Sequence, residues 1–171
     1  MIKKSFFLFA LFLFSYNIVY AQPFLDKGKK DIMFYLEKSI EYCTRIAESE
    51  TPEQIYRSKT QIDIHEKFVG IPLTYDRACW VRANVITNHL LMILGYLEEA
   101  MIIAAKDKKG SLTRKIQYEN NFARRIIDDA KAARLVTGTE HYDKKITEAL
   151  NSTEEISINI KELIDIVKKT Y

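Results

Sequence analysis

The sequence has few residues that end helices, with 5 glycines and 3 prolines among 171 residues. It also lacks any stretch in which apolar and polar residues alternate for long enough to indicate a β-strand. No internal repeat or low-complexity linker divides the chain. These absences argue against a sheet-based fold and predict one domain that is built from long helices.

Motifs for catalysis and for cofactor attachment are absent as well. The sequence contains no GxSxG, no HExxH and no phosphate loop, and no CxxCH that would attach haem through thioethers. Spacings such as HxxxH, ExxH or CxxC, which place two metal ligands on one helix face, do not occur either. We therefore expect a non-catalytic protein more than an enzyme.

The first 21 residues have the pattern of a signal peptide. Lysines at positions 3 and 4 precede an apolar run over residues 6–14, and the segment ends in Val19-Tyr20-Ala21. The apolar run is about 9 residues long, which is shorter than the roughly 20 residues of a spanning helix. We expect cleavage after Ala21, a single domain over residues 22–171 with no membrane span, and a periplasmic or extracellular location. An uncleaved membrane anchor is the rival interpretation.

The charge balance says little about partners once this segment is removed. The whole chain has 26 basic and 23 acidic residues. Without Lys3 and Lys4, 24 basic residues stand against 23 acidic ones, a net charge of +1. Nucleic acid is therefore not an expected partner. A protein or a small ligand is the expected partner.

Helical periodicity and breaker residues divide the rest of the chain into five expected helices. These cover about 26–49, 51–69, 75–106, 111–137 and 140–169. Thr51-Pro52-Glu53-Gln54 has the capping-box pattern of a helix start, and Gly70-Ile71-Pro72 has that of a stop. Gly110 is expected to end the third helix, and Ser111 to cap the fourth.

The apolar face of each expected helix can be assigned from the same periodicity. The faces are Met33, Leu36, Ile40, Cys43 and Ala47 in the first helix; Ile55, Ile62 and Val69 in the second; Ala83, Ile86, Leu90, Ile93, Leu94, Leu97, Met101 and Ala104 in the third; Leu112, Ile116, Ala123, Ile126, Ala130 and Ala133 in the fourth; and Tyr142, Ile146, Ala149, Thr153, Ile156, Ile160, Leu163 and Val167 in the fifth. Because the last stripe continues through Asn151-Ser152, the fifth helix is expected to be one long helix.

Short connections between long helices make neighbouring helices antiparallel. The sequence therefore predicts an all-α fold, an up-and-down antiparallel bundle of four to five helices after the signal peptide. Whether the first two helices form a hairpin or one kinked helix stays open.

This topology brings unusual polar residues toward one end of the bundle. Arg82, His89 and Tyr96 recur every seven residues on the third helix and make a polar ladder on an otherwise apolar surface. The candidate binding cluster is His65, Glu66, Cys79, Arg82, His89, Tyr96, Arg134 and His141. The plainest interpretation is an ordinary capped and salt-bridged bundle end.

Two functions compete for this cluster. The leading hypothesis is an exported, non-catalytic binding or interaction protein that works through a helical face or a bundle end. The alternative is a periplasmic metal or haem carrier, because His65, Cys79, His89 and His141 are of the right ligand type.

For the two cysteines, the expected cellular compartment and the expected geometry give opposite predictions about a disulfide. Cys43 and Cys79 invite a disulfide in an exported chain. However, helix two keeps them roughly 27 Å apart if the first two helices form a hairpin, and about 30 Å or more apart if they form one kinked helix. A disulfide needs Cα atoms within about 7 Å, so we expect no intramolecular disulfide.

Overall fold

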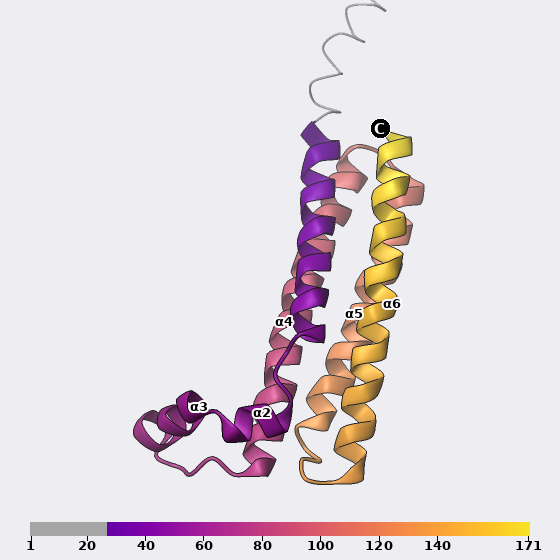
Figure 1. Ribbon diagram of the computed structural model, residues 1–171. Helices are drawn as coiled ribbons and strands as arrows, with labels where there is room; N and C mark the ends of the chain where they lie inside the picture. Colours follow the sequence, from indigo (N-terminus) through magenta and orange to yellow (C-terminus); the bar gives the residue numbers. More distant parts are fainter. Residues whose placement is uncertain (1–26) are drawn as a thin grey trace, which may run out of the picture.

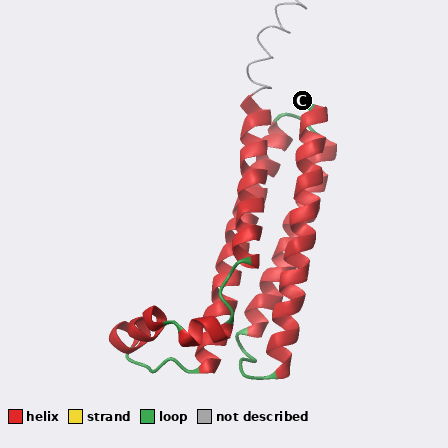
Figure 2. Ribbon diagram, in the orientation of Figure 1, coloured by secondary structure: helices red, strands yellow, loops and turns green. Residues whose placement is uncertain are grey.

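The computed structural model describes residues 27–171, and all the regular structure within that range is helical (Figure 2). The segment expected to be a signal peptide, residues 1–21, lies outside the described residues.

Four long helices lie side by side and make the body of the molecule (Figure 1). They are α1, which is helical over residues 27–47 of the described range, α4 (Tyr75–Lys106), α5 (Gly110–Ala133) and α6 (Glu140–Thr170). Contacts between α4 and α5 run in opposite chain directions: Asn120 of α5 donates to the Leu94 carbonyl of α4, and Arg134, directly after α5, donates to Asn84 of α4. The expected all-α fold with antiparallel packing is confirmed.

The helical periodicity located the core of α5 and α6. All eight stripe residues of α6, from Tyr142 to Val167, are buried, and so are the six face residues of α5, from Leu112 to Ala133. α6 also continues without a break through Asn151-Ser152. For a helix that packs against neighbours along its whole length, the buried face can therefore be predicted from the sequence period alone.

α4 is the most apolar of the long helices. It begins after Thr74, whose hydroxyl accepts from the Arg77 amide at 3.2 Å, and it ends at Lys106 as predicted. Of its eight expected face residues, Leu94 and Met101 are only partly buried. By length and composition α4 could cross a membrane, but the core helix of a soluble bundle passes the same test.

The α4–α5 turn differs from the prediction. Gly110 does not end α4 but is the first residue of α5, and no side chain caps that helix. The left-handed residue of the turn is Lys108, with φ 57°. Backbone bonds from the amides of Lys108 and Lys109 to the last carbonyls of α4 close the turn, so it does not need a glycine.

The prediction of a single second helix is wrong. The segment forms α2 (Pro52–Arg57), α3 (Lys59–Ile64) and a π-helical turn, η1 (His65–Val69). Ser58 breaks the helix with ψ 115°, and its hydroxyl accepts from the Gln61 amide and so caps α3. The predicted boundaries are both confirmed, with a capping box at Thr51 and Gln54 and a left-handed Gly70 at φ 69°.

Residues 52–74, called the lobe below, project sideways from one end of the bundle (Figure 1). The first two predicted helices therefore form neither a packed hairpin nor one kinked helix. α2 holds the lobe to α4 through a small apolar cluster that includes Ile55, Leu73 and Ala78. Tyr75 adds a hydrogen bond to Glu53 at 2.8 Å, whereas α3 has no buried residue at all.

α1 packs antiparallel to α4 with a slightly different face from the predicted one. Its buried residues are Gly28, Ile32, Leu36, Ser39, Cys43 and Ile46, while Met33 and Ile40 are only partly buried and Ala47 is exposed. The buried set recurs at steps of four and three, and it includes the polar Ser39, whose hydroxyl donates to the Tyr35 carbonyl. The face was predicted from apolar residues alone, so Ser39 was left out and the neighbouring Ile40 was assigned in its place.

Candidate functional site

The eight predicted site residues do not gather in one place. Arg82 and His89 line the same cavity, which lies between α1, α3 and α4. Glu66 and His141 are exposed on separate elements, η1 and α6. The expected convergence of all three histidines depended on a packed second helix, and the lobe replaces that helix.

Cys79 and Arg134 take part in contacts between bundle helices. The Tyr142 hydroxyl donates to the Cys79 carbonyl at 2.9 Å, and burial raises the pKa of Tyr142. Arg134 donates to the Asn84 side chain at 3.1 Å. These contacts tie α6 and α5 to α4, so both residues belong to the architecture of the bundle.

Tyr96 belongs to an aromatic group at the α1–α4 contact. Its ring lies 6.1 Å from that of Tyr35 and 5.7 Å from that of Tyr42, while Tyr42 also meets His89 edge-on at 5.5 Å. Such edge and tilted pairs contribute about 0.5–1.5 kcal/mol each beyond area burial. The polar ladder of α4 is therefore the seam along which α1 packs.

His65 is a buried histidine with a local partner. Its Nδ1 lies 2.9 Å from the Gln61 carbonyl in the preceding turn. Within residues 27–171, no group of three or more His, Cys, Asp or Glu side chains is placed to hold a metal ion. The structure thus offers no observation in favour of the metal-carrier alternative.

The cavity that holds Arg82 and His89 has a volume of about 270 Å³. The end of α1 contributes Arg45 and Glu48, and the link that follows contributes Glu50. The remaining polar lining residues come from the lobe, from that link and from α4: Gln61, Ser49, Arg82 and His89. Three basic side chains from two helices therefore meet at the junction of bundle and lobe.

Two of the residues that line this cavity, Arg82 and His89, each have a nitrogen, Nε and Nδ1 respectively, that is buried away from the cavity space and has no hydrogen-bond partner. Burial lowers the pKa of His89, and the charge of Arg45 lowers it further. Arg45 itself pairs with Glu41 at 2.6 Å and lies over the Tyr42 ring at 4.7 Å. An unpaired buried donor costs roughly 1–3 kcal/mol, so this pair of atoms needs an explanation.

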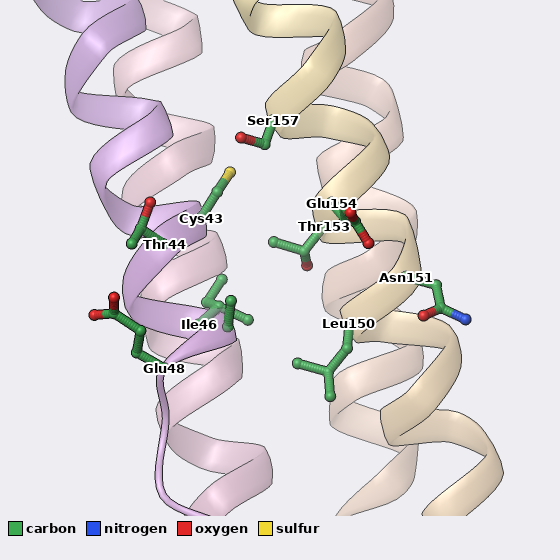
Figure 3. Close-up of a pocket in the computed structure, with 10 residues that line it drawn as sticks. Cys43, Thr44, Ile46, Glu48, Leu150, Asn151, Thr153, Glu154 and Ser157 are labelled. Carbon is green, nitrogen blue, oxygen red and sulfur yellow. The ribbon is translucent and has the colours of Figure 1, made fainter.

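A larger cavity of about 450 Å³ separates α1 from α6 (Figure 3). Cys43 points its sulfur toward the gap, and Thr153 and Ser157 face it from α6 (Figure 3). Thr153 already donates to the Ala149 carbonyl at 2.7 Å. This groove presents a thiol, hydroxyls and the exposed carboxylates of Glu48 and Glu154, a mixture that singles out no ligand class.

Both cysteines are buried free thiols. Burial raises the pKa of Cys43 to about 12 and also raises that of Cys79. A thiolate is the reactive form of cysteine, so neither side chain is set up as a nucleophile. The reason given above for keeping them apart was wrong, because α1 and α4 are neighbours and the second helix does not lie between them.

The lobe carries a concentration of exposed apolar side chains. Five large ones lie in it, and a sixth, Tyr75, directly follows it. The lobe residues are Tyr56, Ile64, Phe68, Val69 and Ile71, and Phe68 is 83% exposed. Sequence reasoning missed this surface because it placed Val69 on a buried helix face.

Comparisons with protein-family models, with curated proteins and with solved structures find no match to this chain. The function has to be argued from the residues and their geometry.

One signal in the sequence could have located the cavity. Ser58 and Gln61 have the S-x-x-Q spacing of a helix start, which marks a break inside the expected second helix. A break at that point separates α3 from α2 and turns it away from the bundle. Nothing in the sequence shows that Arg45 of α1 comes to lie beside Arg82, because only the packing of α1 on α4 brings them together.

Proposed function

We propose that this protein is an exported, non-catalytic binding protein that docks onto another protein through the lobe. The observation that carries the proposal is the cluster of exposed apolar residues in residues 52–74, with Phe68 83% and Ile71 56% exposed. Large exposed apolar side chains that gather in one segment mark interaction surfaces.

The packing of the lobe supports this role. Helices in proteins gain most of their stability from burying one face, yet α3 buries none of its six residues. Ile55 of α2 and Leu73 anchor the lobe to Ala78 of α4, with Ile62 of α3 partly buried against them, so the outer part can present its apolar side chains without loss of the bundle core. A partner that covers Phe68 and its neighbours would supply the missing burial.

The charge of the lobe favours a protein partner over a lipid surface. Residues 52–74 contain three acidic side chains and three basic ones, Arg57, Lys59 and Lys67. Attachment to an anionic membrane draws on clustered Lys and Arg that are not balanced in this way. The centre of a protein interface is apolar and poor in net charge, which this surface resembles.

Site-specific photo-cross-linking in the native cell envelope tests the proposal. A photo-reactive amino acid replaces Phe68 in one variant and Leu135 in the control, which is 86% exposed but lies outside the lobe. We expect a single protein adduct from position 68 that is absent from position 135. The adduct should also disappear when Ile71→Ser is added.

Three results would contradict the proposal. One is an adduct whose mass is twice that of this chain, since it would identify a second copy as the occupant. Another is an adduct to lipid only. The third is equal cross-linking from positions 68 and 135, which would mean that exposure alone explains the reaction.

A further inference from the structure

One end of the bundle carries a concentration of positive charge. This basic end, where Figure 1 marks the C-terminus, consists of residues 27–31, 103–115 and 165–171. Its basic residues are Lys27, Lys29, Lys30, Lys106, Lys108, Lys109, Arg114, Lys115, Lys168 and Lys169. Its acidic residues are Asp31, Asp107 and Asp165. Ten against three gives a net charge of +7, whereas over the rest of residues 27–171 acidic side chains outnumber basic ones by five.

Direct contacts bring the three segments of the basic end together. Lys109, between α4 and α5, donates to the Thr170 carbonyl of α6 at 3.0 Å, and the Tyr171 hydroxyl donates to Asp107 at 2.7 Å. The Asp107 carboxylate also lies against Gly28 of α1, so closely that a side chain at position 28 would collide with it. This carboxylate is therefore engaged within the end of the bundle.

The acidic residues do not neutralise the basic end. Asp165 pairs with Lys168 at 3.1 Å, and Lys168 is the only one of the ten basic residues that forms an ion pair within residues 27–171. The nearest acidic side chains beyond the basic end lie about one helical turn further along: Glu99, Glu119 and Glu162. With that turn and its Lys161 included, the net charge is still +5.

The helix dipoles explain only part of this concentration. Cations are favourable in the last turns of α4 and α6, which hold Lys106 and Lys168. They are unfavourable at a helix start, yet Lys27, Lys29 and Lys30 occupy the first described turn of α1, and α5 has no acidic residue in its first turn. Like charges gathered in this way repel one another and destabilise the compact state. The stability of the fold therefore does not account for them.

We propose that the basic end binds the surface of a membrane that contains anionic lipid headgroups. Clustered Lys and Arg side chains attract a protein to such a surface. The ten basic residues come from four helix ends and one turn, so their charges are spread across the end of the bundle. An extended layer of negative headgroups complements that distribution better than a single small anion does.

The direction from which the chain reaches the basic end supports a membrane as the occupant. Only residues 22–26 lie between Ala21 and Lys27, and six fully extended steps cover at most about 22 Å. The apolar run of a signal peptide enters the membrane during export, which places the basic end beside it. An uncleaved anchor would hold the same end there.

Membrane binding at this end leaves the lobe free to meet its partner. The lobe projects from the opposite end of the bundle (Figure 1). α4 connects the two ends with 32 residues, a length of about 48 Å at 1.5 Å per residue. The basic end and the lobe share only the expectation of export. Vesicle binding is measured without a protein partner, so its failure and the failure of docking through the lobe are separate outcomes.

Co-sedimentation with lipid vesicles tests the proposal. The protein without residues 1–21 is used, because the hydrophobic core described above lies within residues 27–171. One set of vesicles is phosphatidylcholine alone, and the other contains about 30% phosphatidylglycerol, which makes the surface negative. We expect binding to the anionic vesicles only. Raising the salt from about 0.01 M to about 1 M should abolish it, because the Debye length falls from about 30 Å to about 3 Å.

Substitution then locates the binding surface. The test variant loses three exposed lysines of the basic end, one each from α1, α4 and α5: Lys30→Gln, Lys106→Gln and Lys115→Gln. The matched control loses three exposed lysines outside it: Lys59→Gln, Lys131→Gln and Lys144→Gln. Affinity for the anionic vesicles should fall at least about tenfold in the test variant and less than about threefold in the control. Both variants lose the same charge, so the difference reports its position.

Three outcomes count against membrane binding by the basic end. Equal losses in the two variants overturn the proposal, because net charge alone would then explain the binding. Equal binding to neutral and anionic vesicles overturns it as well, since headgroup charge would play no part. If the protein binds neither kind of vesicle at low salt, the membrane is excluded and an acidic protein becomes the candidate occupant.

Discussion

The bundle and the lobe are built from similar residues but bury them to different extents. In α6 every residue of the eight-membered apolar stripe is buried, whereas α3 buries no residue and neighbouring Phe68 is 83% exposed. Both segments are helical; the Ser58 hydroxyl caps α3, whereas no side chain caps α6. Helix formation and burial are therefore separate events, and only the second depends on which neighbours a helix finds.

The difference is the basis for proposing the lobe as a binding surface. In the bundle, contacts such as Tyr142 with Cys79 and Arg134 with Asn84 satisfy polar groups between helices. The lobe leaves Phe68 uncovered, and Arg82 Nε of α4, near the junction with the lobe, lacks an acceptor. Groups that the fold leaves unsatisfied are the ones for which a partner or a ligand has to be sought.

The largest expected effect is in the bundle core. Leu90 of α4 is fully buried, so Leu90→Ala should lower the free energy of unfolding by about 2–5 kcal/mol in urea denaturation. Leu94→Ala, one turn further along, should cost less because Leu94 is only partly buried. Equal losses at the two positions would mean that α4 presents a different face to the core.

A smaller effect is expected where the lobe meets the bundle. Ile55 is 3% exposed and packs with Leu73 and Ala78. Ile55→Ala should speed amide hydrogen exchange throughout the lobe while exchange in α5 and α6 stays unchanged. Ile64→Ala is the matched control, since Ile64 lies in the lobe but is 39% exposed. Faster exchange across the whole bundle would show that lobe and bundle unfold as one unit.

A buried carboxylate makes the stability of the bundle depend on pH. Glu119 of α5 is 6% exposed and accepts from Asn159 of α6 at 3.2 Å, and burial raises its pKa, with Glu155 and Glu162 adding to the effect. The folded state therefore holds this proton more tightly than the unfolded state does. Its contribution to stability is present below the unfolded pKa and is lost as the pH rises through the folded pKa.

Glu119→Gln should remove that loss. Urea denaturation at a series of pH values from about 4 to 8 should show that the free energy of unfolding of the variant rises relative to that of the parent protein as the pH rises. Glu148→Gln, at an exposed position on the same pair of helices, is the control. A variant that tracks the parent protein at every pH would show that Glu119 does not hold its proton more tightly when folded.

The smallest effect is expected on the surface of the lobe. Phe68→Ser should change the free energy of unfolding by less than about 0.5 kcal/mol, because the ring contributes little to the folded core. The same experiment on Leu135→Ser, at an equally exposed position outside the lobe, provides the comparison. A loss above about 1 kcal/mol at Phe68 alone would mean that the ring is covered in the isolated protein.

Most helix boundaries could be predicted because they depend on local chemistry. Thr51 with Gln54, Thr74 and Gly70 act within a few residues of themselves, and the structure places each where the sequence indicated. The candidate site could be predicted only in part. Arg82 and His89 share one cavity, but His141 does not join them, and Arg45 was not foreseen. A residue on a distant helix cannot be paired with them before the helices are docked.

The sequence by itself determined that the described chain is helical, where the long helices α4 and α6 run, and which stripes of α5 and α6 are buried. Those features follow from helical period and from caps, which act over one or two turns of chain. Tertiary structure alone decided that Tyr35 and Tyr42 of α1 pack against Tyr96 of α4. It also decided that Arg82 Nε and His89 Nδ1 are buried without a hydrogen-bond partner. These outcomes depend on which helices compete for the same apolar surface, a competition that is settled only when all of them pack together.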